Sequence, residues 1–400
     1  MSQYKDFLKY VCQTSANPVG LEVEYAEEVY LHTTDGNTYL DFISGIGVNN
    51  LGFSHPAVVA AVQKQAEKYM HVMVYGEYVQ APQVDLAKEL VSLLPVSLNQ
   101  VYFTNSGTEA NEGALKLAKK FTGRKKLVSF EGSFHGDTHG SCSVTGRAVY
   151  RTPFEPLLPQ VSFLPFNETA RLDEIDETVA AVIIEPIQGE GGMRIPGEDF
   201  LKMLRARCDA AGALLIFDEV QTGFGRTGKL FALEHWGVVP DILTLAKGMG
   251  GGMPLGAFVS SEHIMMSLSS KPALSHVTTF GGHPVSCAAG LAALKVILEE
   301  GLVQKAERDG LWIREQLRVL AEAYPVIRDV RGKGLMIGLE LESADAAAKL
   351  VTGVFKLGVI LGWTLHTEKV IRIMPPLIIS SQALNEGLSK IASVLGAVKE

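Results

Sequence analysis

Three short apolar runs in the middle of the chain constrain its fold more than any other sequence feature. They span residues 182–184, 214–217 and 242–246, and each has the length of a buried strand. Between the first two, residues 200–211 carry apolar side chains at helical spacing, and Gly212 follows where the helix would end. Short apolar strands alternating with helices are typical of βαβ units. We therefore expect an α/β fold with a mostly parallel central sheet.

Each of the three runs ends in an ionisable residue, namely Glu185, Asp218 and Lys247. In an open parallel sheet, ligands bind beyond the carboxyl ends of the strands, so these side chains are expected to face one crevice. A single charge at a strand end is more often a solvated surface group than a functional one. The convergence of three such residues favours a ligand site.

A strand, a turn of small residues and a helix follow one another over residues 101–121. Ser106 and Glu109 fit a capping box at the start of the helix, and Gly107 lets the backbone come close to a ligand. With Thr108, this turn would present free N–H groups and the positive end of a helix dipole to an anion. A well-capped helix without a ligand explains the segment equally well.

The rest of the chain indicates a second, smaller α+β domain. A chain of 400 residues is long enough for two domains. Its last third contains helical stretches from about residue 284 and strand-like pieces near residues 334–341 and 370–374. We expect a large domain at residues 46–290 and a small domain formed by residues 1–45 and 291–400.

Charge and cysteine content narrow the partners of the chain. Its net charge is −8 and its basic residues form no block, so neither nucleic acid nor a membrane surface is expected as a partner, and a small molecule is favoured. The first nine residues lack the apolar core of a secretory signal. The four cysteines are far apart and form no CxxC pair. We expect reduced thiols and a cytoplasmic location.

Two motifs that suggest other sites are set aside. Residues 223–228 read GFGRTG and match the GxGxxG pattern of dinucleotide-binding folds, but five residues separate them from the preceding apolar run, and no clear helix follows. His135 and His139 stand four residues apart, yet Gly136 and Gly140 disfavour a shared helix, and no third ligand is evident. We therefore expect neither a nicotinamide site nor a metal site.

Six motifs, in this order along the chain, resemble those of the class III aminotransferases. They are SGTEA at 106–110, FHG at 134–136, EPIQGEGG at 185–192, DEVQTG at 218–223, LAKG at 245–248 and TTFGG at 278–282. This family consists of pyridoxal-phosphate (PLP) enzymes of fold type I and includes the acetylornithine, ornithine and 4-aminobutyrate aminotransferases. The resemblance extends from about residue 20 to about residue 380. It implies a PLP-dependent transferase of fold type I, with PLP as cofactor.

The resemblance also implies the roles of the residues around the cofactor ring. Lys247 and Asp218 would be the catalytic pair: Lys247 would hold PLP as a Schiff base, and Asp218 would keep its ring nitrogen protonated. Val220 and Phe134 would pack on the two ring faces, and Gln221 would contact the phenolic oxygen. Burial lowers the pKa of a lysine and favours the neutral amine that Schiff-base chemistry needs. A protonated ring nitrogen makes the cofactor an electron sink.

Other residues of the same motifs would complete the cofactor site. Gly107 and Thr108 would bind the phosphate. Thr279 would reach in from a partner subunit, which implies a homodimer with shared active sites. The remaining motif residues expected at the cofactor are Ser106, His135, Glu185 and Thr278.

Four positions bear on the substrate through the same resemblance. Arg372 matches an arginine that binds a substrate carboxylate, and Glu190 matches the glutamate that pairs with it when an ω-amino donor is bound. A structural ion pair is the alternative. Asp137 stands where glutamate-using members usually carry an arginine, so a simple glutamate and 2-oxoglutarate pair is not favoured. Ile46 stands where ornithine-specific members tend to carry tyrosine, so ornithine itself is not favoured.

Donor and acceptor stay open at this point. The expected reaction is ping-pong transfer from an amino donor, such as N-acetylornithine, ornithine or 4-aminobutyrate, to a 2-oxo acid. Arg147 or Arg151 could replace the missing arginine, the acceptor could be monocarboxylic, such as pyruvate, or Asp137 could bind a second amino group of a diamine-like donor. The alternatives to transamination are another PLP reaction on the same fold (aminomutase, racemase or decarboxylase) and a non-catalytic PLP-binding protein.

Overall fold

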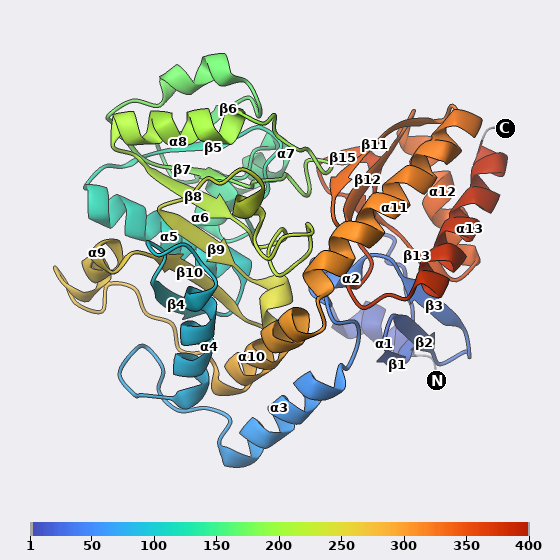
Figure 1. The fold of residues 1–400 in the computed structure, drawn as a ribbon, viewed down its shortest axis with the longest axis horizontal. Helices are drawn as coiled ribbons and strands as arrows, with labels where there is room; N and C mark the ends of the chain where they lie inside the picture. The colour runs from blue at the N-terminus through green and yellow to red at the C-terminus, as the bar shows by residue number, and fades with distance from the viewer. Residues whose placement is uncertain (1–2, 399–400) are drawn as a thin grey trace.

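The computed structural model describes residues 3–398, which form two lobes (Figure 1). The larger lobe is built on a seven-stranded sheet with the order β4-β10-β9-β8-β7-β5-β6. Its strands are β4 (Gln100–Thr104), β5 (Lys126–Phe130), β6 (Val161–Leu164), β7 (Val179–Ile184), β8 (Leu214–Asp218), β9 (Ile242–Leu245) and β10 (Gly256–Ser260). Neighbouring strands from β9 to β6 are parallel, whereas β10 runs antiparallel to β4 and β9. The mostly parallel sheet predicted from the apolar runs is confirmed.

The sheet is covered on both faces, which explains why its strands read as continuous apolar runs. Every residue of β7, β8, β9 and β10 is buried, as expected for parallel strands between layers of helices. The predicted crossover helix is α8 (Phe200–Ala211), and it buries Leu201, Leu204 and Cys208. Gly212 ends this helix in the left-handed conformation, with φ of 63°.

Helices pack around the sheets of both lobes. The other α-helices are α1 (Gln3–Tyr10), α2 (Ser44–Gly47), α3 (Pro56–Lys68), α4 (Ala81–Ser92), α5 (Gly107–Thr122), α6 (His139–Ser143), α7 (Ala148–Arg151), α9 (Glu262–Met265), α10 (Pro284–Glu299), α11 (Leu302–Ala323), α12 (Ala344–Lys356) and α13 (Ser381–Val398). Short 3-10 helices are η1 (Thr152–Phe154), η2 (Thr169–Glu174), η3 (Ala232–His235), η4 (Lys247–Gly250) and η5 (Met266–Ser269). No helix within residues 3–398 combines the length and the apolar character needed to cross a bilayer.

The smaller lobe combines the two ends of the chain. Its antiparallel sheet has the order β11-β12-β15-β14, and a further sheet has the order β1-β2-β3-β13, in which β3 pairs in parallel with β13. The strands are β1 (Val23–Glu27), β2 (Tyr30–Thr33), β3 (Thr38–Asp41), β11 (Ile327–Lys333), β12 (Met336–Leu341), β13 (Val359–Ile360), β14 (Gly362–Thr364) and β15 (Thr367–Ile373). The pairing of β3 with β13 brings the N-terminal segment to the C-terminal part of the chain.

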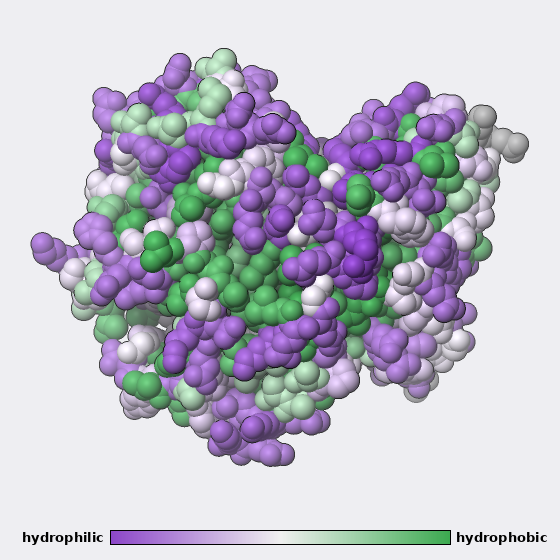
Figure 2. Space-filling model, in the orientation of Figure 1, coloured by the Kyte–Doolittle hydropathy of each residue, from purple (hydrophilic) through white to green (hydrophobic). Residues whose placement is uncertain are grey.

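The predicted domain boundaries are not decided by this arrangement. Helix α10 continues past residue 290 and packs against α3 and α4, so the boundary at 290/291 stays a prediction. Residues 1–2 and 399–400 of the predicted small domain lie outside the described residues. Figure 2 shows the same face in space-filling form, with a notch between the lobes, hydrophilic side chains over most of the outer surface and hydrophobic ones towards the centre.

Candidate active site

The three strand-end residues meet in one cavity. Strands β7, β8 and β9 are neighbours in the sheet. Glu185 directly follows β7, Asp218 is the last residue of β8, and Lys247 comes two residues after β9. All three line a cavity of about 510 Å³. The convergence predicted from the strand ends is therefore present in the structure.

The turn before α5 forms another part of this cavity, through Ser106, Gly107 and Thr108. A Cβ atom on Gly107 would lie 2.7 Å from the Val220 side chain, so the turn leaves no room for a larger residue. Ser106 Oγ accepts a hydrogen bond from the backbone N–H of Glu109 at 3.3 Å. The reciprocal bond of the predicted capping box goes elsewhere, because Glu109 Oε2 accepts from the N–H of Asn105 at 2.8 Å. Only half of the capping box is confirmed.

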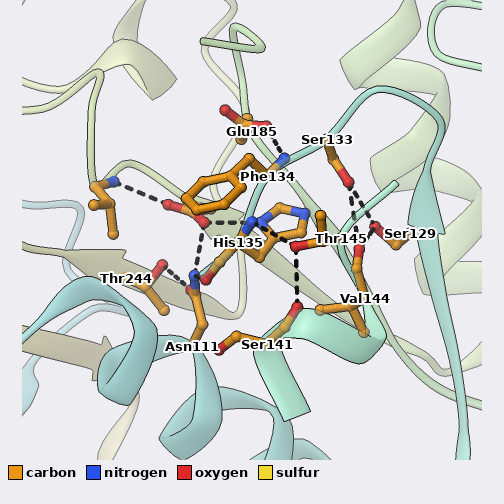
Figure 3. Close-up of polar contacts among 12 residues, drawn as sticks. Asn111, Ser129, Ser133, Phe134, His135, Ser141, Val144, Thr145, Glu185 and Thr244 are labelled. Atoms are coloured by element: carbon orange, nitrogen blue, oxygen red, sulfur yellow. Dashed lines mark hydrogen bonds and ion pairs between the residues drawn. The ribbon is translucent and has the colours of Figure 1, made fainter. Parts of the chain in front are cut away.

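Asp218 is held by hydrogen bonds on both carboxylate oxygens and is only 4% exposed. Its Oδ2 accepts from Asn111 Nδ2 at 2.7 Å and lies 2.8 Å from His135 Nδ1. Its Oδ1 accepts from the N–H of Val220 at 3.0 Å. Thr244 Oγ1 in turn donates to Asn111 Oδ1 at 2.7 Å (Figure 3). This network fixes the carboxylate at the cavity wall.

Sequence reasoning missed Asn111 and Thr244 as parts of this network. A signal for Asn111 was available, because it is a polar residue on the helix face that also buries Ala114, Leu115 and Ala118. A buried amide needs partners. Its partner on β8 becomes visible only when α5 packs on the sheet.

Glu185 is the second buried acid at this end of the cavity. It accepts from the N–H of Phe134 and from that of Gly189, each at 2.9 Å. Burial raises the pKa of Glu185 to about 7; His135 and the two backbone bonds oppose the shift, and the charge of Asp218 adds to it. At neutral pH, Glu185 is therefore close to the point at which it gains or loses its proton.

Lys247 has the electrostatic and conformational character of a functional residue. Burial lowers the pKa of its amine, an effect that Glu190 opposes and Arg372 strengthens. Its φ of 48° is unusual for a residue with a side chain. Such strain is concentrated at functional sites. Because its pKa is lowered, the amine of Lys247 loses its proton more easily than that of an exposed lysine.

A buried ion pair borders the cavity through Glu190, whereas its partner Arg372 does not line the cavity. Arg372, on β15, is 2% exposed, and its Nη2 pairs with Glu190 Oε1. Glu190 lines the cavity, and its Oε2 accepts from the N–H of Leu365 at 2.7 Å. Burial opposes ionisation, but the charges of Arg372 and Lys247 outweigh it and hold the pKa of Glu190 below its usual range. Arg372 Nε is buried without a hydrogen-bond partner among the described residues.

Of the predicted substrate residues Asp137 and Ile46, only Asp137 lies at the cavity. Asp137 lines the cavity and is exposed. Ile46 is 48% exposed and does not line it, although Val48 from the same segment does. The structure therefore does not bring Ile46 to the cavity of its own chain. Because φ is positive at Ser44 and Ile46, the segment turns sharply and leaves Val48 at the cavity wall in place of Ile46.

The two predicted threonines also lie away from the cavity of their own chain. Neither Thr278 nor Thr279 lines it. Thr278 Oγ1 accepts from Asn105 Nδ2 at 3.2 Å, and Asn105 does line the cavity. Any contact of Thr279 with a cofactor would therefore have to be made outside the cavity of its own chain.

The GFGRTG segment has a structural role. Arg226 within it is fully buried. Its Nη1 donates to the carbonyl oxygens of Leu335 and Pro375, and its Nη2 donates to Asn50 Oδ1 and Ser44 Oγ. Burial lowers the pKa of Arg226 to about 9, against the charge of Asp41. Arg226 thus joins segments from both lobes next to the cavity.

The two histidines of the suspected metal motif are separated. His139 begins α6, whereas His135 lies in the loop before it and contacts Asp218. Within the described part of the chain, no group of three or more His, Cys, Asp or Glu side chains is arranged to hold a metal ion. His135 instead supports the buried acid.

Comparison with known proteins identifies the family. A family model described as aminotransferase class-III matches residues 11–395. The chain belongs to the class III aminotransferases. Its six motifs therefore reflect membership in this family, as the sequence resemblance indicated.

Individual relatives extend over nearly the whole chain. Acetylornithine aminotransferase from Methanopyrus kandleri is 45% identical over 364 residues, with 91% of each chain covered. The protein of the same name from Methanocaldococcus jannaschii is 43% identical over 392 residues, covering 96% of this chain and 95% of the relative. Both alignments are long enough to include the full set of motifs.

Solved structures share the fold. An ornithine aminotransferase from Toxoplasma gondii ME49 superposes with a TM-score of 0.92 at 31% identity and covers 99% of this chain and 94% of its own. A transaminase from the marine bacterium Virgibacillus gives a TM-score of 0.93 at 30% identity, with 100% and 99% covered. The fold is that of the PLP-dependent transferases of fold type I.

The family uses PLP, and a Toxoplasma gondii ornithine aminotransferase structure that is 30% identical to this chain is described with PLP at its active site. This class III chain is therefore a PLP-dependent aminotransferase. Its cavity fits the cofactor: the α5 turn suits a phosphate, Asp218 suits a protonated ring nitrogen, and Lys247 suits an aldehyde. The amide oxygen of Gln221 is buried without a partner among the described residues, so a ligand would satisfy it.

Proposed function

We propose that this aminotransferase takes nitrogen from the terminal amine of an ω-amino donor and passes it to a 2-oxo acid. The observation that carries the proposal is the buried Glu190–Arg372 pair, which lies close enough to Lys247 for both charges to affect its pKa. While Glu190 neutralises Arg372, no uncompensated arginine borders the cavity among residues 3–398. A donor without a carboxylate at its reacting carbon can then bind. The names of the acetylornithine and ornithine aminotransferases that resemble this chain support the same donor class.

The residues of the chain divide the chemistry among them. PLP, when bound, supplies an aldehyde that condenses with amines and a ring that withdraws electrons from the carbon next to the nitrogen. Lys247 would bind that aldehyde through its Nζ and, once displaced by the donor, take the proton from the donor carbon as general base. Asp218 would keep the ring nitrogen protonated. Phe134 and Val220 would hold the ring between them.

Arg372 would act in the second half of the reaction. A 2-oxo acid carries a carboxylate next to its reacting carbon, and the guanidinium offers two-point recognition of that group. Its Nε has no hydrogen-bond partner among the described residues, so it would donate to this carboxylate. For it to bind, Glu190 has to move aside or share the arginine. The pair would thus work as a charge switch between the two half-reactions.

The proposal includes a homodimer and a cytoplasmic location. Thr279 would bind the cofactor phosphate in the partner's cavity. If so, a mixture of Lys247→Ala and Thr279→Ala chains regains activity, because one site of each mixed dimer is intact. If each active site were built from one chain alone, every site in the mixture would lack either Lys247 or Thr279. A mixture that regains no activity would therefore contradict shared active sites. The four cysteines are free, which suits a reducing compartment.

A donor panel tests the function. Terminal amines and α-amino acids are supplied with pyruvate or 2-oxoglutarate, and both products are measured. We expect turnover with terminal amines only when a 2-oxo acid is present. Turnover without any 2-oxo acid would favour an aminomutase, racemase or decarboxylase instead.

The charge switch is tested by Glu190→Gln. The variant leaves Arg372 uncompensated, so kcat/KM should shift towards α-amino acids and away from terminal amines by about tenfold, the effect of roughly 1.4 kcal/mol. Glu342→Gln is the matched control, because Glu342 pairs with Arg328 on the exposed surface. An equal shift in both variants, or none in Glu190→Gln, contradicts the switch.

A further inference from the structure

Asp137 differs from the other acids that line the cavity. Four carboxylates line it, those of Asp137, Glu185, Glu190 and Asp218. Glu185 and Asp218 accept several hydrogen bonds, and Glu190 is paired with Arg372. Among residues 3–398, no hydrogen bond or ion pair engages the side chain of Asp137. It is therefore the one acid lining the cavity, in the described part of the chain, whose carboxylate is not engaged by another residue and can contact a ligand.

The backbone around Asp137 is fixed on both sides. Gly136 has φ of 122°, and a Cβ atom there would lie 2.4 Å from Thr108 Oγ1, so only glycine fits. Thr138 donates its N–H to Thr108 Oγ1 at 3.2 Å, and its hydroxyl is bonded to Glu112. Because Thr108 lines the cavity on the α5 turn, this anchoring ties the position of Asp137 to the cofactor site.

The two arginines considered for a distal carboxylate are engaged elsewhere. Arg147 Nη1 donates to the carbonyl oxygen of Leu365 at 3.2 Å, and its guanidinium lies over the Tyr150 ring. Arg151 donates to the carbonyl oxygen of Thr145 and lies 4.0 Å from the centroid of the Phe163 ring. Neither arginine lines the cavity. Neither is therefore placed to offset the charge of Asp137.

We propose that Asp137 is a specificity residue that binds a second cationic group of the donor, so that the preferred donors are terminal diamines. This inference rests on the proposed terminal-amine function and narrows its substrate class. One amine of the diamine reacts at Lys247, and the other, which stays protonated, forms a charge-assisted contact with Asp137. The same carboxylate repels the distal carboxylate of a dicarboxylic substrate. The enzyme then prefers a monocarboxylic acceptor and binds N-acetylornithine, which carries a carboxylate, less well than a diamine.

A homologous series of diamines, each compared with the n-alkylamine of the same length, tests this binding. Pyruvate is the acceptor, and kcat and KM are measured separately. At the length that spans Lys247 and Asp137, the wild type should have a KM for the diamine about fivefold below that for the monoamine. Because the contact is electrostatic and Asp137 is exposed, the preference should shrink at high salt.

Substitution of the acid assigns the effect to one residue. Asp137→Asn should raise the KM of diamines about fivefold, leave that of n-alkylamines unchanged, and leave kcat and thermal stability unchanged. Asp137→Arg should remove the diamine preference and make dicarboxylic 2-oxoglutarate a better acceptor relative to pyruvate, through a lower KM. Asp173→Asn is the matched control, since Asp173 is exposed and lies outside the cavity lining.

The possible results distinguish the role of Asp137 from the proposed function. Equal effects of Asp137→Asn on diamines and monoamines, or a wild type with no diamine preference at any length, overturn the role of Asp137 and leave the terminal-amine function standing. If neither diamines nor monoamines are donors while α-amino acids are, the proposed function itself fails.

Discussion

The buried acids Asp218 and Glu190 face the same cavity but are held in different ways. Asp218 has Asn111, His135 and the N–H of Val220 as partners, all within the larger lobe. Glu190 is held by Arg372 and by the N–H of Leu365, both from the β14–β15 region of the smaller lobe. The first acid is fixed within one packed core, whereas the second depends on a contact between lobes.

This difference separates a carboxylate that is fixed in place from one that can exchange its partner. Both carboxylates have partners on both oxygens, but those of Asp218 all belong to one packed core, so Asp218 has no alternative position that keeps its bonds. An arginine with an unused Nε can exchange one carboxylate for another at a lower cost. Under the proposed function, the Asp218 network would hold one carboxylate in place throughout the reaction, whereas Glu190 would release Arg372 to the second substrate.

The largest effect is expected at the fixed carboxylate of Asp218. Asp218→Asn keeps the shape of the side chain but removes the charge that would hold the ring nitrogen protonated. We expect the cofactor to remain bound and kcat to fall about 10³-fold, the scale for losing a preorganised electrostatic contact. Single-turnover kinetics with a saturating donor measure it. A loss below about tenfold with PLP bound would make the acid dispensable.

A smaller effect is expected at Asn111, which donates a hydrogen bond to Asp218. Asn111→Ala leaves Asp218 Oδ2 short of one donor in a buried site, which costs about 1–3 kcal/mol, or about 5- to 150-fold in rate. Thr244→Val acts through Asn111 and should cost less than Asn111→Ala. The order of kcat values, with Asp218→Asn lowest and Thr244→Val highest, is the test. If Thr244→Val were slower than Asn111→Ala, the chain of support would be wrong.

Substitution of Arg372, the partner of Glu190, should change KM rather than kcat. Arg372→Lys retains a positive charge for Glu190 but loses the two-point fork. We expect the KM of the 2-oxo acid to rise about tenfold while the terminal-amine half-reaction changes little. Separate half-reaction kinetics decide this. A comparable loss in both halves would mean that Arg372 serves only the structure of the site.

The smallest effect concerns pH and stability. The pKa of Glu185 is raised from an ordinary 4.5 to about 7, so the folded chain binds more protons than the unfolded chain in this range. Its contribution to stability is complete below pH 4.5 and is lost as pH rises through 7. Glu185→Gln, freed of PLP, should therefore lose less stability than wild type between pH 4.5 and 7 in urea titrations. Parallel curves for the two proteins would contradict the raised pKa.

The sequence predicted the features that depend on local pattern. The strands leading to Glu185, Asp218 and Lys247, helix α8 with its Gly212 cap, and the Ser106 cap follow from short-range periodicity and backbone preference. Shared strand direction then placed the three ionisable residues at one edge of the sheet. These elements required no knowledge of how distant segments pack.

The features that sequence reasoning missed depend on tertiary packing. Asn111 reaches Asp218 only because α5 lies on the sheet, and Arg226 meets Ser44, Asn50 and Pro375 only when both lobes are assembled. Glu109 bonds to Asn105 instead of closing the capping box at Ser106. No spacing rule within the sequence encodes these partners.

The attachment point of the cofactor tests the central claim most directly. The PLP-loaded enzyme is reduced with borohydride, which makes the bond between cofactor and amine permanent, and the labelled peptide is identified by mass spectrometry. We predict a single labelled residue, Lys247, and no label in Lys247→Ala. A label on any other lysine of the active wild type would contradict the account.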